Sequence, residues 1–207
     1  MYSQLAITRF GLLRHAETEW NKQKRIQGHS DSPLTAEGKA SADQWGSTLK
    51  TLPINRIISS DLGRVRETSQ TINRHLNLPV VEDMRLREQN WGQWEGLSIP
   101  DIENTAEFKA ELISGWNFRP RAGESRMEVW HRSHEALLQA ARKWPGDTLL
   151  VVTHEGVIRC LIYMLFGRKF GPHEPPLIEP KHLHWLVCQD GRLKVDEINA
   201  LRAELKQ

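Results

Sequence analysis

Histidines at positions 15 and 154 each follow a short apolar segment, and an arginine directly precedes the first of them. An uncharged imidazole is a competent nucleophile toward phosphorus. The guanidinium of Arg14 would favour the uncharged form of His15 and would bind phosphate oxygens in a bidentate manner. Phosphoryl transfer also needs further cations around the phosphate and an acid for the leaving alkoxide. Arg64 and His154 could supply the first, and Glu88 the second.

Each of these residues also has an ordinary structural interpretation when it is taken alone. An Arg-His pair after a strand is common, and His154 could simply cap the helix that follows it. Arg64 at a helix start is typical of a solvated face, and Glu88 could be a surface ion-pair partner. Only the order of all these residues along one chain favours a shared catalytic site.

Strand-like and helix-like segments alternate along the chain and predict where these side chains lie. Strand-like apolar segments cover residues 7–13, 57–58, 80–81 and 149–153, and helices are expected at about 36–52, 64–76, 125–144 and 157–166. Such alternation is typical of an α/β fold, here a three-layer sandwich whose mainly parallel central sheet has helices on both faces. Ligands of such sheets bind beyond the carboxyl ends of the strands, which predicts that His15 and His154 meet there.

Two further segments complete the predicted architecture. Residues 183–188 and 193–198 flank Asp190-Gly191, which indicates a hairpin and hence an antiparallel edge of the sheet. Residues 92–123 combine mixed signals with several tryptophans, and we interpret them as a partly helical excursion that covers the site. A length of 207 residues fits a single domain spanning 1–207.

Composition excludes several classes of protein. The 28 Lys and Arg residues nearly balance 26 Asp and Glu, so charge alone does not suggest a nucleic-acid or membrane partner. The longest apolar run, residues 160–166, is far shorter than the roughly 18 residues that suggest a transmembrane helix. Residues 1–17 lack the pattern of a leader peptide, and Cys160 and Cys188 have no metal or redox spacing. We expect a cytoplasmic protein with reduced cysteines.

The remaining histidines give little indication of a metal site. His131 and His134 lie three residues apart on an expected helix, and His182 and His184 lie two apart on an expected strand. We expect no carboxylate or thiolate companion to complete a ligand set for either pair, so neither resembles a typical metal site.

Five segments carry a resemblance to a known family: LLRHAETEWN at 12–21, RIQGHSDSPLTAEG at 25–38, ISSDLGRVRET at 58–68, RLREQNWGQWEG at 85–96 and VVTHEGVIR at 151–159. In order and separation they resemble the histidine phosphatase superfamily, in its phosphoglycerate mutase-like branch. The resemblance extends over nearly the whole chain, and agreement among five motifs is far more specific than any one of them.

The resemblance implies a role for each matching residue. His15 would be the nucleophile that forms phosphohistidine, with Arg14, Arg64 and His154 completing the phosphate pocket and Glu88 acting as general acid and then base. The matching substrate-binding positions are Asn21, Gln27, Gly28 and, as a weaker match near the rim, Arg66. No metal or other cofactor is implied.

Three positions depart from the family pattern. Ala16 replaces a glycine after the nucleophile and is small enough to be tolerated, whereas Glu155 replaces the glycine after the second histidine. A carboxylate there would repel substrate, so we favour the interpretation that Glu155 points away over recognition of a cationic or hydroxylated substrate group. Arg121, in the RAGES segment, is a candidate substrate contact peculiar to this chain.

The residues after Glu88 favour a phosphatase over a mutase. The family's mutases carry basic residues there to hold a carboxylated substrate, whereas this chain has Gln89, Asn90 and Trp91. Trp91, with other rings of the excursion at Trp94, Trp116 and Phe118, would form an apolar lid over a bulkier phosphomonoester. The alternative that these rings belong to the core stays open.

Three functions are therefore expected in descending order. The first is a metal-independent phosphatase acting on a small phosphorylated metabolite through phosphohistidine. The second is a phosphoglycerate mutase that uses 2,3-bisphosphoglycerate as cofactor, and the third is a phosphate-binding scaffold with little activity. The expected partner is a small metabolite rather than nucleic acid or membrane, and the chain would be a monomer or a homodimer.

Overall fold

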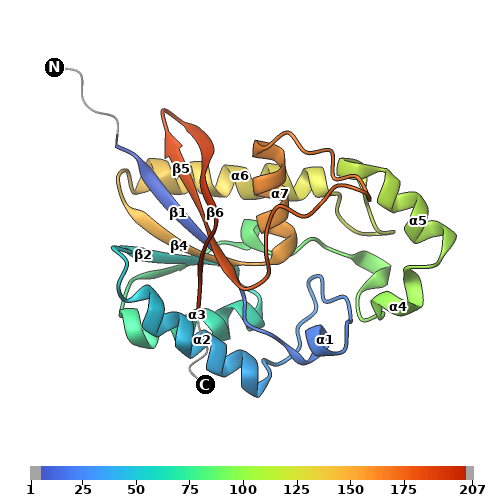
Figure 1. Cartoon of the computed structure of the whole chain (residues 1–207), viewed down its shortest axis with the longest axis horizontal. Helices are drawn as coiled ribbons and strands as arrows, with labels where there is room; N and C mark the ends of the chain where they lie inside the picture. The colour runs from blue at the N-terminus through green and yellow to red at the C-terminus, as the bar shows by residue number, and fades with distance from the viewer. Residues whose placement is uncertain (1–5, 204–207) are drawn as a thin grey trace.

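A six-stranded sheet forms the centre of the molecule in the computed structural model, which describes residues 6–203 (Figure 1). Residues 1–5 lie outside the described residues. They are part of the N-terminal stretch that was interpreted above as lacking the pattern of a leader peptide. The strand order is β3-β2-β4-β1-β5-β6. The strands are β1 (Thr8–Arg14), β2 (Arg56–Ser59), β3 (Val80–Glu82), β4 (Thr148–Thr153), β5 (His182–Gln189) and β6 (Arg192–Arg202).

The strand directions match the expected mainly parallel sheet. The first four strands along the chain pair in parallel with one another, while β5 and β6 add an antiparallel edge next to β1. Asp190 and Gly191 join β5 to β6, and both have positive φ, as a two-residue type I′ hairpin turn requires. The expected α/β fold with an antiparallel edge is confirmed.

Helices cover both faces of the sheet. The larger ones are α2 (Ala36–Leu49), α3 (Gly63–Leu76), α6 (Arg126–Lys143) and α7 (Glu155–Leu165). Along β4, Leu149 and Val151 join a core with α6 and α7, whereas Leu150 and Val152 join a second core with α2 and α3. Because successive side chains of a strand point to opposite faces, this alternation places the two helix pairs on opposite sides of the sheet, as Figure 1 shows.

The ends of these helices follow local sequence signals. The Ser125 hydroxyl accepts a hydrogen bond from the Glu128 N–H while the Glu128 carboxylate accepts from the Ser125 N–H, so the predicted capping box is present. At α2, Thr35 caps the first turn as expected, but the helix ends at Leu49 rather than near residue 52. No helix among residues 6–203 is long and apolar enough to cross a membrane.

The excursion forms a third apolar cluster beside the sheet. It contains α4 (Ile99–Ile102), α5 (Ala106–Ile113) and 3-10 turns at Gly92–Trp94 and Gly115–Asn117, and it lies close to α1 (Glu19–Lys22) in Figure 1. Trp94 and Phe118 are buried inside this cluster. Trp116 packs instead on Phe170. Of the four rings expected to form an aromatic lid, three are therefore packing residues, and only Trp91 lines the cavity described below.

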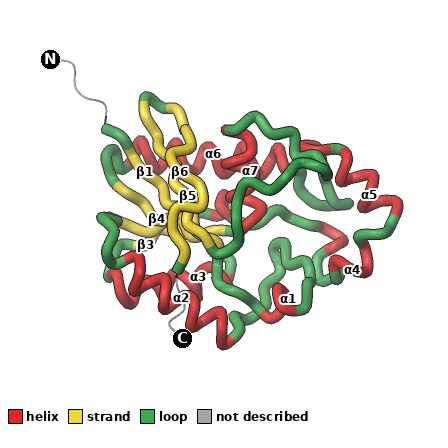
Figure 2. The backbone as a smooth tube through the Cα atoms, viewed as in Figure 1, coloured by secondary structure: helices red, strands yellow, loops and turns green. Residues whose placement is uncertain are grey.

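The segments that build the site are mostly irregular. Apart from α1, the chain between β1 and α2 is drawn as loop in Figure 2. A further 3-10 turn at Met84–Leu86 follows β3 and leads directly to Glu88. Loops of this kind carry functional groups while the sheet holds their ends in place.

Candidate active site

The sheet brings the two histidines together. Parallel strands β1 and β4 are in register, with Arg14 opposite Thr153, so His15 and His154 leave the same edge as immediate neighbours. Their ring centroids lie 5.2 Å apart in an edge-to-face arrangement. Residues separated by 139 positions thus share one crevice, at the carboxyl end of the parallel strands.

Hydrogen bonds fix the tautomer of His15. The carbonyl oxygen of Ala16 lies 2.7 Å from Nδ1 and can only accept, so Nδ1 carries the proton. Nε2 accepts a hydrogen bond from Nε of Arg64 at 3.3 Å and keeps its lone pair. Burial, together with the positive charges of Arg14 and Arg64, holds the pKa of His15 well below its usual value. The ring is therefore uncharged at neutral pH with Nε2 available as a nucleophile.

Arg64 is the centre of the positive part of the site. Its side chain is 1% exposed, and all five of its N–H groups donate to protein acceptors. The acceptors are the rings of His15 and His154, the carbonyl oxygens of Gly28 and Ser30, and the carboxylate of Asp31. Desolvation lowers the pKa of Arg64, and the charges of Glu88 and Asp31 oppose that shift. These bonds hold the Arg64 guanidinium rigidly against both histidines.

His154 has the opposite tautomer. Its Nδ1 accepts from Nη2 of Arg64 at 3.1 Å, so Nε2 carries the proton and donates to the Ser60 hydroxyl at 3.0 Å. Burial and the charge of Arg64 hold the pKa of His154 well below its usual value. His154 is therefore an uncharged ring fixed in orientation, and it adds no formal positive charge to the ligand-free site.

Glu88 faces the start of α7. Its carboxylate accepts from the N–H of Gln89 at 2.8 Å and from the N–H of Gly156 at 3.3 Å. A Cβ added at position 156 would lie 2.2 Å from Oε1 of Glu88, so this approach requires a glycine. The family's usual glycine is absent one position earlier, but the neighbouring Gly156 gives the backbone its close approach to the carboxylate.

A loop after β1 surrounds the phosphate side of the site. Gly28 has φ +53°, and a Cβ there would overlap the carboxylate of Glu95. That carboxylate accepts from the N–H groups of His29 and Ser30, which fixes the loop whose carbonyls hold Arg64. Asn21 lines the cavity and also caps α1 through Thr18. Gln27 lines the cavity, and its buried amide oxygen has no hydrogen-bond partner within the described part of the protein.

A cavity of about 330 Å³ joins these groups. It is lined by Arg14, His15, Asn21, Arg25, Ile26, Gln27, Gly28, Arg64, Glu88, Gln89, Trp91, Ile99, Glu155, Gly156 and Arg159. It therefore combines an uncharged imidazole, cations and a carboxylic side chain in one pocket, which is the set of groups that transfer of a phosphoryl group from an ester requires.

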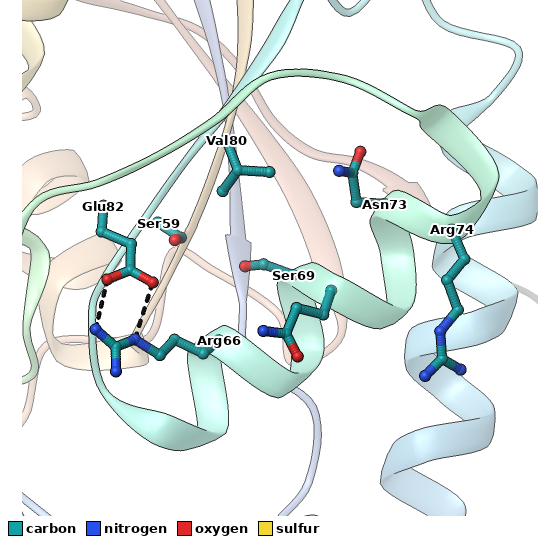
Figure 3. Close-up of a pocket in the computed structure, with 8 residues that line it drawn as sticks. Ser59, Arg66, Ser69, Asn73, Arg74, Val80 and Glu82 are labelled. Atoms are coloured by element: carbon teal, nitrogen blue, oxygen red, sulfur yellow. Dashed lines mark hydrogen bonds and ion pairs between the residues drawn. The ribbon is translucent and has the colours of Figure 1, made fainter.

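Two expected substrate contacts lie elsewhere. Arg66 lines a separate pocket between α3 and β3, where it forms a two-pronged ion pair with Glu82 (Figure 3). Arg66 lies two residues after Arg64 on α3, and because a helix turns by about 100° per residue, the two side chains leave nearly opposite sides of the helix. Arg121 is exposed and is not among the residues that line the catalytic cavity; its carbonyl accepts from the Gln93 N–H.

Glu155 does not point away from the cavity, which corrects the interpretation favoured from the sequence. It is the first residue of α7, and the first turn of that helix forms one wall of the cavity. Its carboxylate pairs with Nη1 of Arg14, and both side chains are partly exposed. The ion pair offsets the repulsion that an isolated carboxylate would exert on a phosphate.

Several residues of the site were not found from the sequence. Asp31 accepts from the N–H of Gly63 at 2.7 Å and from Nη1 of Arg64 at 2.8 Å, so it both caps α3 and orients the guanidinium. Arg132 donates to the carbonyl oxygens of Arg85 and Glu88 and supports the loop that carries the acid. No local spacing signals these contacts, because the partners lie more than 30 residues apart in the chain.

Comparisons with known proteins agree with this geometry. The profile of the "Histidine phosphatase superfamily (branch 1)" matches residues 10–201. A curated relative from Escherichia fergusonii, called probable phosphoglycerate mutase GpmB, is 40% identical over 158 residues, 75% of this chain and 74% of the relative. A relative of the same name from Klebsiella pneumoniae has the same identity and coverage.

Solved structures show the same fold. Bacillus stearothermophilus YhfR superimposes with a TM-score of 0.86 at 29% identity, covering 95% of this chain and 98% of that one. A mycobacterial glucosyl-3-phosphoglycerate phosphatase superimposes with a TM-score of 0.78 at 27% identity, covering 94% of this chain and 100% of that one. With the profile match over most of its length, this chain belongs to the histidine phosphatase superfamily, branch 1.

Proposed function

We propose that this protein is a metal-independent phosphatase that hydrolyses a small phosphomonoester through a phosphohistidine at Nε2 of His15. The observation that carries the proposal is the state of His15. Its Nε2 lone pair faces Arg64 inside a buried pocket, its Nδ1 proton is held by the Ala16 carbonyl, and Glu88 lies in the same cavity. These are the nucleophile, the charge stabiliser and the proton donor of one reaction.

In the first step, Nε2 of His15 gives up its hydrogen bond from Nε of Arg64 and attacks phosphorus as the bond to the ester oxygen breaks. Protonated Glu88 gives its proton to that oxygen, and the alcohol leaves. The Nδ1–H bond to Ala16 O stabilises the positive charge that the ring acquires. Arg14 and the Nε–H of Arg64 that Nε2 releases stabilise the equatorial oxygens of the phosphoryl group. His154 does not line the cavity, and its bond to Nη2 holds Arg64 in position.

In the second step, water replaces the alcohol. Ionised Glu88 takes a proton from the water, the water oxygen attacks phosphorus, and the N–P bond breaks. Inorganic phosphate leaves, and His15 and Glu88 return to their starting protonation states. In this scheme Asn21, Gln27 and Gly28 contact the phosphate and Trp91 the alcohol part.

A mutase is the second candidate, and one observation favours it. Arg25 and Arg159 line the cavity in addition to Arg14 and Arg64, so the pocket holds more cations than the residues after Glu88 suggest. A carboxylated substrate would find partners there. For a mutase, 2,3-bisphosphoglycerate would phosphorylate His15 before the first turnover.

The test is release of phosphate from p-nitrophenyl phosphate in excess EDTA. We expect hydrolysis by the wild type, none by His15→Ala, and normal hydrolysis by His173→Ala, which removes an exposed histidine outside the cavity. Acid-labile phosphate on the wild type after rapid quenching would identify the intermediate. Failure of the wild type in EDTA with recovery on adding a divalent metal would contradict the proposal. Formation of 2-phosphoglycerate from 3-phosphoglycerate without phosphate release would favour the mutase.

A further inference from the structure

The N-terminal part of α7 presents two opposite charges to the catalytic cavity. Glu155 and Arg159 are four residues apart, so they lie on one face of the helix, separated by an axial rise of about 6 Å. Both line the same cavity as His15 and Glu88. The helix whose Gly156 N–H contacts Glu88 therefore also brings two charged side chains to the cavity wall.

The two charges do not neutralise one another. The Glu155 carboxylate pairs with Arg14. The Arg159 guanidinium lies 5.3 Å from the ring centroid of Tyr163 and 5.1 Å from that of Phe170, and no carboxylate among residues 6–203 forms an ion pair with it. Stacking on aromatic rings fixes the guanidinium and leaves its N–H groups able to bind an anion.

A phosphate bound in the cavity would compete with Glu155 for Arg14. A phosphate dianion attracts a guanidinium more strongly than a partly exposed carboxylate does, and Arg14 directly precedes the nucleophile. Were Arg14 to turn to the phosphate, Glu155 would lose this ion pair while it still lined the cavity. The occupied site would then carry an unpaired carboxylate and an unpaired guanidinium one helical turn apart.

We propose that the alcohol part of the substrate is zwitterionic, with an ammonium group that binds Glu155 and a carboxylate that binds Arg159. This inference rests on the proposed phosphatase activity and names its substrate class, a phosphomonoester of a hydroxy-amino acid. Glu155 and Arg159 are then specificity-determining residues. Arg25, on another part of the cavity wall, already donates to the carbonyl oxygen of Gly96 and is the less available cation.

Four phosphomonoesters of similar size test the two charges separately. Phosphoserine carries both groups, 3-phosphoglycerate has a hydroxyl in place of the ammonium, phosphoethanolamine lacks the carboxylate, and glycerol 3-phosphate lacks both. Phosphate release gives kcat/KM for each. From the strength of hydrogen bonds to charged groups, we expect kcat/KM for phosphoserine to exceed that for 3-phosphoglycerate and that for phosphoethanolamine by roughly tenfold or more.

Variants assign each preference to a side chain. In Glu155→Gln the preference for phosphoserine over 3-phosphoglycerate should fall to within about threefold, because a neutral amide does not pair with an ammonium. In Arg159→Gln the preference for phosphoserine over phosphoethanolamine should fall in the same way. Glu179→Gln is the matched control, because it removes a carboxylate that lies outside the catalytic cavity. Arg142→Gln is the corresponding control, at an exposed arginine outside the cavity, and Arg25→Gln tests the other cation of the cavity wall.

The outcomes separate this inference from the proposed function. Hydrolysis of p-nitrophenyl phosphate that depends on His15, without preference for phosphoserine, overturns the zwitterionic substrate and leaves the phosphatase in place. A preference that survives Glu155→Gln, or that Arg25→Gln abolishes in place of Arg159→Gln, also overturns the assignment. No hydrolysis of any ester overturns the proposed function and this inference with it.

Discussion

The close approach of Gly156 to Glu88 makes one substitution especially informative. In Gly156→Ala the new Cβ would lie 2.2 Å from Oε1 and 3.1 Å from Cδ of Glu88, whereas ordinary contact begins at 3.4 Å. The backbone of α7 at this point follows β4 directly and has little freedom to move. We therefore expect the carboxylate to retreat by roughly 1 Å and its hydrogen bond from the residue 156 N–H to break.

The structure also sets the size of the effect. A displacement of this size at a catalytic group costs on the order of 10²-fold in rate. Alanine is a better helix former than glycine by about 1 kcal/mol, which offsets part of the strain in the folded state. Gly156→Ala should therefore lose proton transfer while it stays folded.

Leaving groups distinguish this effect from general damage. We expect kcat/KM for an alkyl phosphate to fall roughly 10²-fold, and kcat/KM for p-nitrophenyl phosphate to fall much less, because nitrophenolate leaves without a proton. Gly171→Ala is the control, since a Cβ there meets only Glu174 Cγ at 3.8 Å. Equal losses for both esters, or none for either, would refute the placement of Glu88 as the acid.

Three further predictions concern the groups around the nucleophile. Asp31→Ala removes the acceptor for the Gly63 N–H and for Nη1 of Arg64; urea titration should show a loss of about 1–2 kcal/mol, as for other lost helix caps, and kcat/KM should fall as well. An unchanged stability would show that Asp31 does not cap α3. His15 and His154 have lowered pKa values in the native state. Below about pH 6.5 the unfolded chain therefore binds more protons than the native one. The free energy of unfolding should fall by roughly 1.4 kcal/mol per pH unit for each ring until that ring protonates in the native state. Urea unfolding between pH 7 and pH 5 measures this slope, and His154→Asn should make it shallower; a slope identical in the variant would contradict the assignment. Arg66→Ala should keep kcat/KM within about twofold, because its ion pair with Glu82 is exposed and outside the cavity. A tenfold loss would bring Arg66 back into the substrate site.

The sequence by itself determined the elements and which polar side chains follow each strand end. Apolar stretches, capping residues and turn residues act over a few positions, so β1, β4, the capping box of α6 and the hairpin at Asp190 could be recognised locally. The strand-helix alternation then required His15 and His154 to emerge at one edge of the sheet. The placement of Arg14 and Arg64 near these histidines could also be predicted, because each arginine is adjacent to an element whose position was predicted.

Tertiary structure alone decided which side chains act together around those groups. Glu155 pairs with Arg14 across 141 positions, and Glu88 reaches Gly156 across 68. Arg66, two residues after Arg64, faces a different pocket, and Phe118 is buried in the excursion rather than lying over the site. These outcomes depend on how loops cross between strands. A loop's path follows from packing and from carboxylates such as Asp31 and Glu95 that bind distant N–H groups, and neither leaves a local pattern in the chain.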